Sequence, residues 1–181
     1  MKHYEEWNLD GRCRTASLNR LIPELFNNQS VLYVGARTDR MDYGDNFRDG
    51  GSTVDVLEIF EPNVAYLKTV DWINEVHCGD VRTFSTDKKY DIVFWWHGPE
   101  HIPEKDLPAT LALLEDNAKV AVVLGCPWGN FPQGHLHSNP NEEHVSHYNY
   151  DIFEDLGYSV ECIGQKDTPG SNITCVKYME R

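Results

Sequence analysis

The sequence predicts an α/β fold, a three-layer α/β/α sandwich in which helices cover both faces of a mostly parallel, seven-stranded sheet. Two observations predict it. Short apolar runs alternate with amphipathic stretches along most of the 181 residues, and strands that alternate with helices pair in parallel through right-handed crossovers. The last two apolar runs are joined by a turn instead of a helix, so we expect them to form an antiparallel hairpin at one edge of the sheet.

The individual elements follow from the spacing of apolar residues. In an N-terminal helical extension, 1–30, apolar positions recur at three- and four-residue steps over 16–28, which predicts a helix. Continuous apolar runs predict strands at 31–35, 54–59, 75–78, 90–95, 119–124, 159–164 and 172–178. Further helices are predicted at 62–70, 104–115 and 150–156, with a reduced helix near 45–49.

Length and spacing indicate a single domain over residues 1–181, because this is an ordinary single-domain length and no linker divides the chain. The regular pattern stops at 125–148, which is rich in Gly, Pro, Asn and His. Irregular segments of this length inside a domain are usually functional or disordered, and Trp128 and Phe131 favour a packed segment. We therefore expect 125–148 to form a lid over a substrate.

The charge of the chain disfavours two classes of partner. Sixteen Lys and Arg against 29 Asp and Glu give a net charge of −13, which repels phosphate backbones and anionic lipid headgroups. Nucleic acid and membranes are therefore poor default partners, and a small molecule or conjugate is favoured. We find no signal-peptide or membrane-spanning run, and the five scattered cysteines form no CxxC pair. We expect a cytoplasmic protein.

Residues suited to a nucleoside follow the first predicted strands, and in parallel sheets ligands bind at the carboxyl ends of the strands. Gly35 allows close approach of the backbone to a ligand, Glu58 can accept both ribose hydroxyls, and Asp80 can accept from an adenine amino group. The alternatives are a structural cap or ion pair for Glu58 and an ordinary turn for Asp80. The predicted nucleoside contacts are Gly35, Ala36, Glu58, Ile59, Asp80, Val81 and Trp96.

These strand ends resemble the motifs of class I S-adenosylmethionine (SAM)-dependent methyltransferases. VLYVG, ending at Gly35, matches the glycine motif, VLEI with Glu58 the acidic second motif, GDV with Asp80 the third, and YDIVFW at 90–95 the fourth. The run DIFEDLGY at 151–158 is also similar to the element before the final hairpin of many members. The resemblance implies a Rossmann-like fold, SAM as cofactor and methyl transfer as the activity.

The resemblance covers 18–178, with departures at the glycine motif. Tyr33 stands where these enzymes usually carry an acid, and Arg37 and Asp39 stand where further glycines are usual. A lone Gly is a weak fingerprint. Contacts to the methionine part of the cofactor are therefore the least specified.

The fourth strand is followed by His97, Glu100 and His101, where the resemblance implies that the transferring methyl group points. Methyl transfer requires alignment of donor and acceptor and the removal of one proton. An imidazole that titrates near neutrality suits that task, so these three are the predicted catalytic residues. The alternative is that His97 packs over the cofactor and His101 caps the next helix.

Six of the eight histidines lie between the fourth strand and the last helix, at positions 97, 101, 135, 137, 144 and 147. Their spacings can place two imidazoles near one ion, but spacing on an irregular segment does not fix geometry. We therefore predict no metal site, and we predict Trp128, His144 and His147 as substrate contacts. Trp95 and Trp96 should face opposite sides of the sheet, so at most one faces the site.

The sequence thus predicts SAM-dependent methyl transfer to a small-molecule or conjugate acceptor. Two alternatives remain open: a non-catalytic nucleoside-binding, SAM-binding or interaction module on the same fold, and a metal-dependent hydrolase that uses the His-rich segment. A nicotinamide dehydrogenase is disfavoured because no G-x-G-x-x-G follows the first strand.

Overall fold

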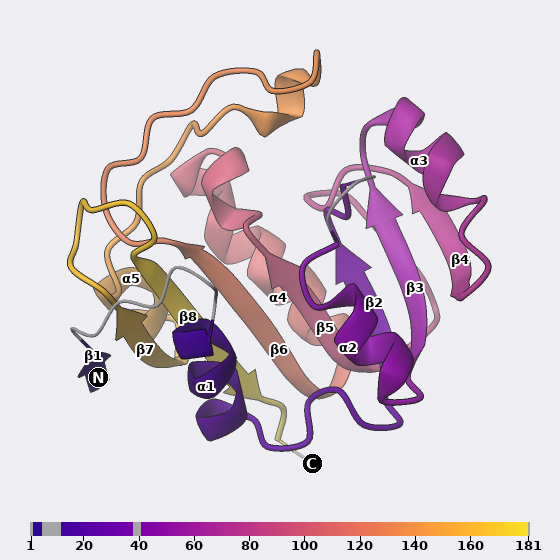
Figure 1. Ribbon diagram of the computed structural model, residues 1–181, viewed down its shortest axis with the longest axis horizontal. Coiled ribbons are helices and arrows are strands. Elements are labelled where there is room, and N and C mark those ends of the chain that lie inside the picture. Colours follow the sequence, from indigo (N-terminus) through magenta and orange to yellow (C-terminus); the bar gives the residue numbers. More distant parts are fainter. Residues whose placement is uncertain (1, 5–11, 38–40, 181) are drawn as a thin grey trace.

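A computed structural model describes residues 2–4, 12–37 and 41–180 of the chain (Figure 1). Its strands form one sheet in the order β1-β7-β8-β6-β5-β2-β3-β4. The strands are β1 Lys2–Tyr4, β2 Ser30–Val34, β3 Thr53–Glu58, β4 Ile73–Cys78, β5 Tyr90–Trp96, β6 Ala118–Pro127, β7 Ser159–Ile163 and β8 Asn172–Tyr178. All seven predicted strands are therefore present.

The direction of the strands is parallel except for β8, which is antiparallel to both of its neighbours, β6 and β7. The predicted hairpin is confirmed, but β8 enters the sheet between β6 and β7. The outermost strand is the unpredicted three-residue β1, which pairs in parallel with β7. We had expected residues 1–30 to form a helical extension, but this part of the chain also contains the strand β1. Three residues are too few for a period, which is why the sequence did not reveal β1.

Helices cover both faces of the sheet, as predicted (Figure 1). The α-helices are α1 Arg12–Leu21, α2 Gly44–Asp49, α3 Glu61–Leu67, α4 Leu107–Asn117 and α5 Asp151–Asp155, and the 3-10 turns are η1 Pro99–His101, η2 Glu104–Asp106 and η3 Pro140–Glu142. The prediction of a helix through residue 28 was wrong, because Pro23 disfavours helical backbone before it and Glu24 and Asn28 have positive φ values of 63° and 53°. The short α2 confirms the reduced helix.

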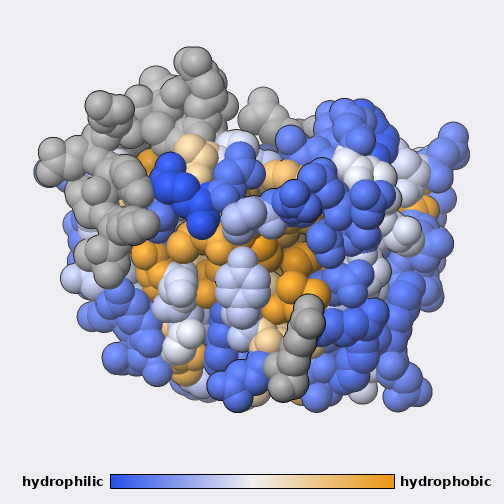
Figure 2. All heavy atoms as spheres, turned by 90° about the horizontal axis from the view of Figure 1, so that it is seen from below, coloured by the Kyte–Doolittle hydropathy of each residue, from blue (hydrophilic) through white to orange (hydrophobic). Residues whose placement is uncertain are grey.

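The core consists of two clusters, one on each face of the sheet. Alternate residues of β5 show the division: Val93 and Trp95 pack with α4 and α5, whereas Phe94 and Trp96 pack with α1 and α2. This is the period of two expected of a strand buried on both faces. Viewed from below, apolar residues gather in the middle of one end of the molecule and hydrophilic residues surround them (Figure 2). No helix in the described ranges is long and apolar enough to cross a bilayer.

Residues 128–150, here called the arch, connect β6 to α5 and rise over the carboxyl ends of the strands (Figure 1). Strand β6 continues through Pro127, so the irregular segment starts three residues later than predicted. The arch is not featureless, since it contains η3 and short bridges that join Trp128 to Tyr148 and Leu136 to Asn139. Its position places it beside the strand ends where the sequence predicts a site.

Candidate functional site

Two adjoining pockets lie at the carboxyl ends of the central strands. We call the first the nucleoside pocket; residues after β2, β3, β4 and β5 line it, including Gly35, Glu58, Ile59, Asp80, Val81, Trp95, His97 and His101. We call the second the histidine pocket; it is lined by Arg14, Tyr33, Trp96, His97, Glu100, His101, Phe131 and His144, among others. Gly35, Arg37, His97 and His101 border both. The parallel strands therefore bring most of the predicted nucleoside and catalytic residues to the same edge of the sheet.

The nucleoside pocket begins at Gly35, whose backbone has a positive φ of 75°. No atom lies within 4 Å of the place where a Cβ would project, so the backbone here faces open space. Residues with a side chain rarely adopt this backbone conformation, which explains why the residue after β2 is a glycine. The neighbouring Ala36 is fully buried in the core and lines neither pocket, so the predicted contact at Ala36 gains no support from its position. Asp39, which the sequence comparison singled out, lies outside the described residues.

Glu58 ends β3 and is only 4% exposed. Its Oε1 accepts a hydrogen bond of 2.8 Å from the backbone N–H of Phe60. Burial raises the pKa of Glu58, and the nearby charge of Glu142 adds to this, against hydrogen bonds from Phe60 and Asn63. A buried carboxylate at the wall of a pocket is suited to accept hydroxyl groups, which return the hydrogen bonds lost to water.

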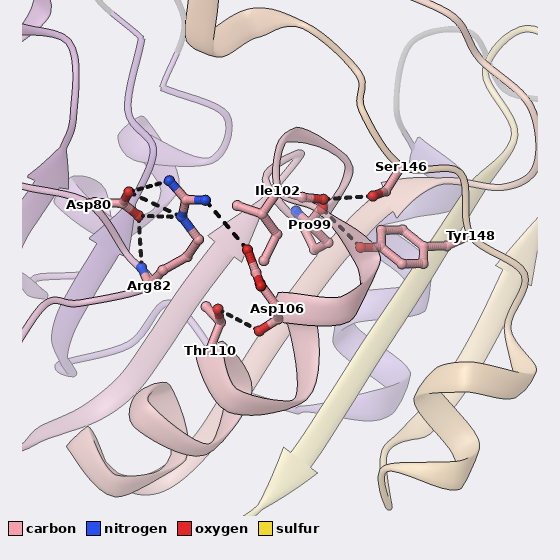
Figure 3. Close-up of polar contacts among 8 residues, drawn as sticks. All are labelled: Asp80, Arg82, Pro99, Ile102, Asp106, Thr110, Ser146 and Tyr148. Carbon is pink, nitrogen blue, oxygen red and sulfur yellow. Dashed lines mark hydrogen bonds and ion pairs between the residues drawn. The ribbon is translucent and has the colours of Figure 1, made fainter.

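Asp80 follows β4 and is held by Arg82 (Figure 3). The guanidinium donates to both carboxylate oxygens, with the closest distance 2.6 Å from Nη2 to Oδ2, and also reaches Asp106 at 3.4 Å. The hydrogen bond with Arg82 lowers the pKa of Asp80. The carboxylate is thus kept ionised, and each of its oxygens accepts two hydrogen bonds from the backbone N–H or the guanidinium of Arg82. A ligand donor at Asp80 would therefore replace or share one of these bonds. The arginine was not predicted, although its position two residues after Asp80 suits a local ion pair.

The two adjacent tryptophans of β5 face opposite sides, as predicted. Trp95 lines the nucleoside pocket. Trp96, the predicted nucleoside contact, lies on the other face, where it stacks on Phe94 with ring centroids 5.7 Å apart and borders the histidine pocket. The alternation of side chains along a strand places the two tryptophans on opposite faces of the sheet. Which of them reaches the nucleoside pocket depends on what covers each face. Trp95, and not Trp96, therefore borders the pocket for which the contact of Trp96 was predicted. Each tryptophan borders one of the two pockets, although we expected at most one to face the site.

His97 stands where the two pockets meet, with a positive φ of 49°. Its Nδ1 lies 3.2 Å from Oε1 of Glu100, and its Nε2 lies 3.3 Å from Nη1 of Arg14. Arginine only donates, so Nε2 accepts and the proton lies on Nδ1, from which it is donated to the carboxylate. The pair has the arrangement of a general base oriented by a buried acid.

Glu100 is 2% exposed. Its burial acts to raise the pKa, but the hydrogen bond from His97 and the electrostatic attraction of His97 and His101 outweigh it, and the net effect lowers the pKa of Glu100. The sequence predicted a role for Glu100 from its place after β5. Its burial and its contact with His97 are visible only in the structure.

Of the three predicted substrate contacts, only His144 lines a pocket, the histidine pocket. Burial lowers its pKa. Trp128 is 7% exposed and packs in the core, where its Nε1 donates to Asn149 at 2.9 Å. His147 is exposed, and its Nδ1 lies 3.4 Å from the backbone N–H of Phe131. The placement of Trp128 and His147 therefore gives no support to direct substrate contact.

The arch is fastened to the segment after β5 by hydrogen bonds from its second half (Figure 3). The Ser146 hydroxyl donates to the Ile102 carbonyl at 2.6 Å, and the Tyr148 hydroxyl donates to the Pro99 carbonyl at 3.2 Å. Two backbone N–H groups of the arch also donate to the carbonyl of Glu100, at 2.9 and 3.1 Å. These bonds fix the arch over the site.

The arch also brings polar residues that the sequence did not identify. Asn139, Asn141 and Glu142 line the nucleoside pocket, and Arg37 after β2 lies 4.0 Å from Glu142 and 3.0 Å from Nε2 of His137. The sequence N-P-N at 139–141 predicts a turn, but the position of this turn relative to β2 depends on the path of the whole arch.

Comparison with known proteins agrees with this geometry at the level of the fold. No family model matches the sequence, and no curated protein sequence matches it. Among solved structures, magnesium protoporphyrin IX methyltransferase (ChlM) from Synechocystis PCC 6803 with bound SAM is similar, with a TM-score of 0.65 and 14% identity over 94% of this chain and 80% of that one.

Two further solved structures are comparably similar. N-methyltransferase NodS from Bradyrhizobium japonicum WM9 has a TM-score of 0.66 and 11% identity over 96% of this chain and 98% of that one. The complex of DhpI with SAH has a TM-score of 0.67 and 16% identity over 94% and 86%. The chain therefore has the Rossmann-like fold of class I SAM-dependent methyltransferases, which confirms the predicted fold.

Proposed function

We propose that this protein is an enzyme that transfers the methyl group of SAM to a small-molecule or conjugate acceptor, with SAM in the nucleoside pocket and the acceptor in the histidine pocket. The observation that carries the proposal is the adjoining pair of pockets, which share Gly35 and His97 at the strand ends. A donor in one and an acceptor in the other would meet at His97. The predicted cytoplasmic location stays a prediction.

The nucleoside pocket fits the parts of the cofactor. Glu58 accepts the ribose hydroxyls, Asp80 and the backbone N–H of Val81 face the adenine, and Gly35 allows the chain close to the ligand. Trp95 supplies an apolar wall. The cofactor brings the electrophilic methyl group, so this chain must hold the acceptor in line and take its proton.

His97 is suited to take that proton. Its Nε2 lone pair, which accepts from Arg14 in this structure, is free for an acceptor hydroxyl or amine once that bond is exchanged. Glu100 holds the ring through Nδ1 and stabilises the imidazolium that forms. His101 borders both pockets, and its catalytic role stays a prediction.

Calorimetric titration with SAM tests the proposal. We expect saturable binding by the wild type and at least about tenfold weaker binding by Glu58→Ala, since a charged hydrogen-bond acceptor is worth about 1.5–3 kcal/mol. Glu75→Ala is the matched control, because Glu75 is an exposed carboxylate on the adjacent strand β4. No binding at millimolar SAM, or equal binding by Glu58→Ala, would refute the proposal.

Transfer of the labelled methyl group from SAM to fractionated small molecules separates an enzyme from a binding module. We expect the wild type to transfer label to an acceptor fraction. His97→Gln should transfer much less label, even at SAM concentrations that saturate the protein at every pH used. SAM binding without transfer to any fraction would favour the non-catalytic alternative.

A further inference from the structure

Three side chains at the floor of the histidine pocket converge on one point. Glu100 and His101 come from η1, and His144 comes from the arch more than forty residues later. One potential ligand atom from each of the three lies within 4.8 Å of the others. Two imidazoles and a carboxylate are a common donor set for a zinc-class cation.

Both imidazoles are already oriented through their Nδ1 atoms. Nδ1 of His101 lies 3.1 Å from the carbonyl oxygen of Glu143, and Nδ1 of His144 lies 2.6 Å from that of Phe131. A carbonyl oxygen only accepts, so each Nδ1 carries the proton and each neutral ring keeps its lone pair on Nε2. Metal-binding histidines are typically oriented in this way, through a bond from the other ring nitrogen to a carbonyl.

The carboxylate supplies a second, independent observation. Oε1 of Glu100 accepts from His97, whereas Oε2 is buried and has no hydrogen-bond partner among the described residues. A buried charged oxygen without a partner is costly, and such oxygens in native proteins usually face an ion or water. A cation between Glu100 and the two imidazoles removes that cost.

A second cluster differs because its buried carboxylate already accepts hydrogen bonds from neighbouring side chains. Asp55, Glu75 and His77 also lie within reach of one another, but the Asp55 carboxylate already accepts from Lys88, Asn74 and Tyr90. A lysine ammonium provides its counter-charge, so this cluster does not call for an ion.

We propose that Glu100, His101 and His144 bind one divalent cation of the zinc class through one carboxylate oxygen and two Nε2 atoms. Nitrogen ligands favour Zn²⁺ over Mg²⁺ and Ca²⁺, which prefer oxygen. Zinc–ligand distances are about 2.0–2.2 Å, so the three side chains draw closer together when the ion binds. This inference departs from our prediction of no metal, because spacing on an irregular segment gave no information on the geometry that the arch imposes.

Three protein ligands leave a fourth position open, as in catalytic zinc sites. That position borders the histidine pocket, so an acceptor that carries an oxygen or nitrogen donor can complete the coordination. This last step rests on the proposed function, whereas binding of the ion does not.

Titration of untagged, chelator-treated full-length protein with Zn²⁺ against a competing chelator tests the site. We expect one equivalent to bind to the wild type, and at least about tenfold weaker binding by Glu100→Gln and by His144→Gln. His135→Gln and Glu104→Gln are the matched controls, because both residues are exposed, lie on the same segments and border neither pocket. No saturable binding, or equal binding by His144→Gln, would overturn the proposal.

A measurement on the wild type guards against variants that do not fold. Co²⁺ in place of Zn²⁺ should give visible absorption typical of nitrogen and oxygen ligands at low coordination number, and the spectrum of aqueous Co²⁺ would count against the site. An excess of Mg²⁺ should not displace the ion; displacement would assign an oxygen-type cation instead and also overturn the proposal.

The two proposals fail separately. We expect Glu58→Ala to lose SAM affinity and keep Zn²⁺, and His144→Gln to lose Zn²⁺ affinity and keep SAM, because His144 does not line the nucleoside pocket. Loss of both ligands in either variant would show a folding defect, which circular dichroism and thermal unfolding detect.

Discussion

The two pockets each contain a buried glutamate, and the two behave in opposite ways. Glu58 is 4% exposed and Glu100 is 2% exposed. The pKa of Glu58 is raised, mainly by burial, whereas burial of Glu100 is outweighed by His97 and His101 and its pKa is lowered. Both carboxylates have their partners within five residues in the chain, but Glu58 accepts from uncharged groups of Phe60 and Asn63, whereas Glu100 lies beside the imidazoles of His97 and His101. Burial alone therefore does not fix the charge of a site; the partners do.

The largest expected effect comes from Gly98, which lines the nucleoside pocket. A Cβ at this position would overlap the indole of Trp95, which is 2% exposed and cannot move aside. We expect Gly98→Ala to lower the free energy of unfolding by about 3 kcal/mol and to weaken SAM binding as well, measured by urea denaturation and calorimetry.

Gly134→Ala is the matched control for this change. Gly134 lies in the arch, and no atom lies within 4 Å of where its Cβ would project. The free energy of unfolding should therefore stay the same or rise by about 0.5 kcal/mol. If both substitutions had equal effects, the close packing of Gly98 on Trp95 would not be what excludes a side chain at position 98.

The second prediction uses pH to separate the two glutamates. Glu100 has a lowered pKa, so it contributes stability above its ordinary value of 4.5, and this is lost as the pH falls through the lowered value. Glu100→Gln should therefore be less stable than the wild type at neutral pH, by about 1–2 kcal/mol, and the difference should shrink in acid.

Glu58→Gln should show the opposite sign. A raised pKa means that the ionised form destabilises the folded state, and the cost is absent below 4.5, where the carboxyl group is protonated in both states. Glu58→Gln should thus be more stable than the wild type at neutral pH and equal to it in acid. Urea denaturation of the metal-free proteins from neutral pH to pH ~3 measures both differences in the free energy of unfolding. If both variants were more stable than the wild type at neutral pH, or both less stable, the contrast between the two glutamates would be wrong.

The smallest expected effect is at Arg82, which holds Asp80 beside the nucleoside pocket. Its side chain is 40% exposed, and exposed ion pairs contribute less than about 1 kcal/mol. Arg82→Gln should therefore barely change the free energy of unfolding, but the pKa of Asp80 should rise toward its ordinary value of 3.8.

Carboxylate titration by NMR measures this pKa. Lys89→Gln is the control, since Lys89 forms a similarly exposed ion pair with Asp116 away from the pockets. A pKa of Asp80 that stays low without the guanidinium would mean that the backbone N–H of residue 82 holds the carboxylate instead.

Residues at or just after the end of a strand were predictable. Gly35, Glu58 and Asp80 lie in the nucleoside pocket because parallel strands end at one edge, a consequence of topology that local patterns reveal. Trp128 was not predictable in the same way: it was expected to touch a substrate but packs in the core. On an irregular segment no period tells an inward side chain from an outward one.

The sequence by itself determined the seven main strands, the alternation that divides Trp95 from Trp96, and the carboxylates at the strand ends, because these depend on neighbours close in the chain. Only the tertiary structure decided which tryptophan reaches the pocket and that His144 lies beside Glu100 and His101. The reason is physical: the arch has no repeating pattern, and hydrogen bonds to residues some forty positions earlier fix its path.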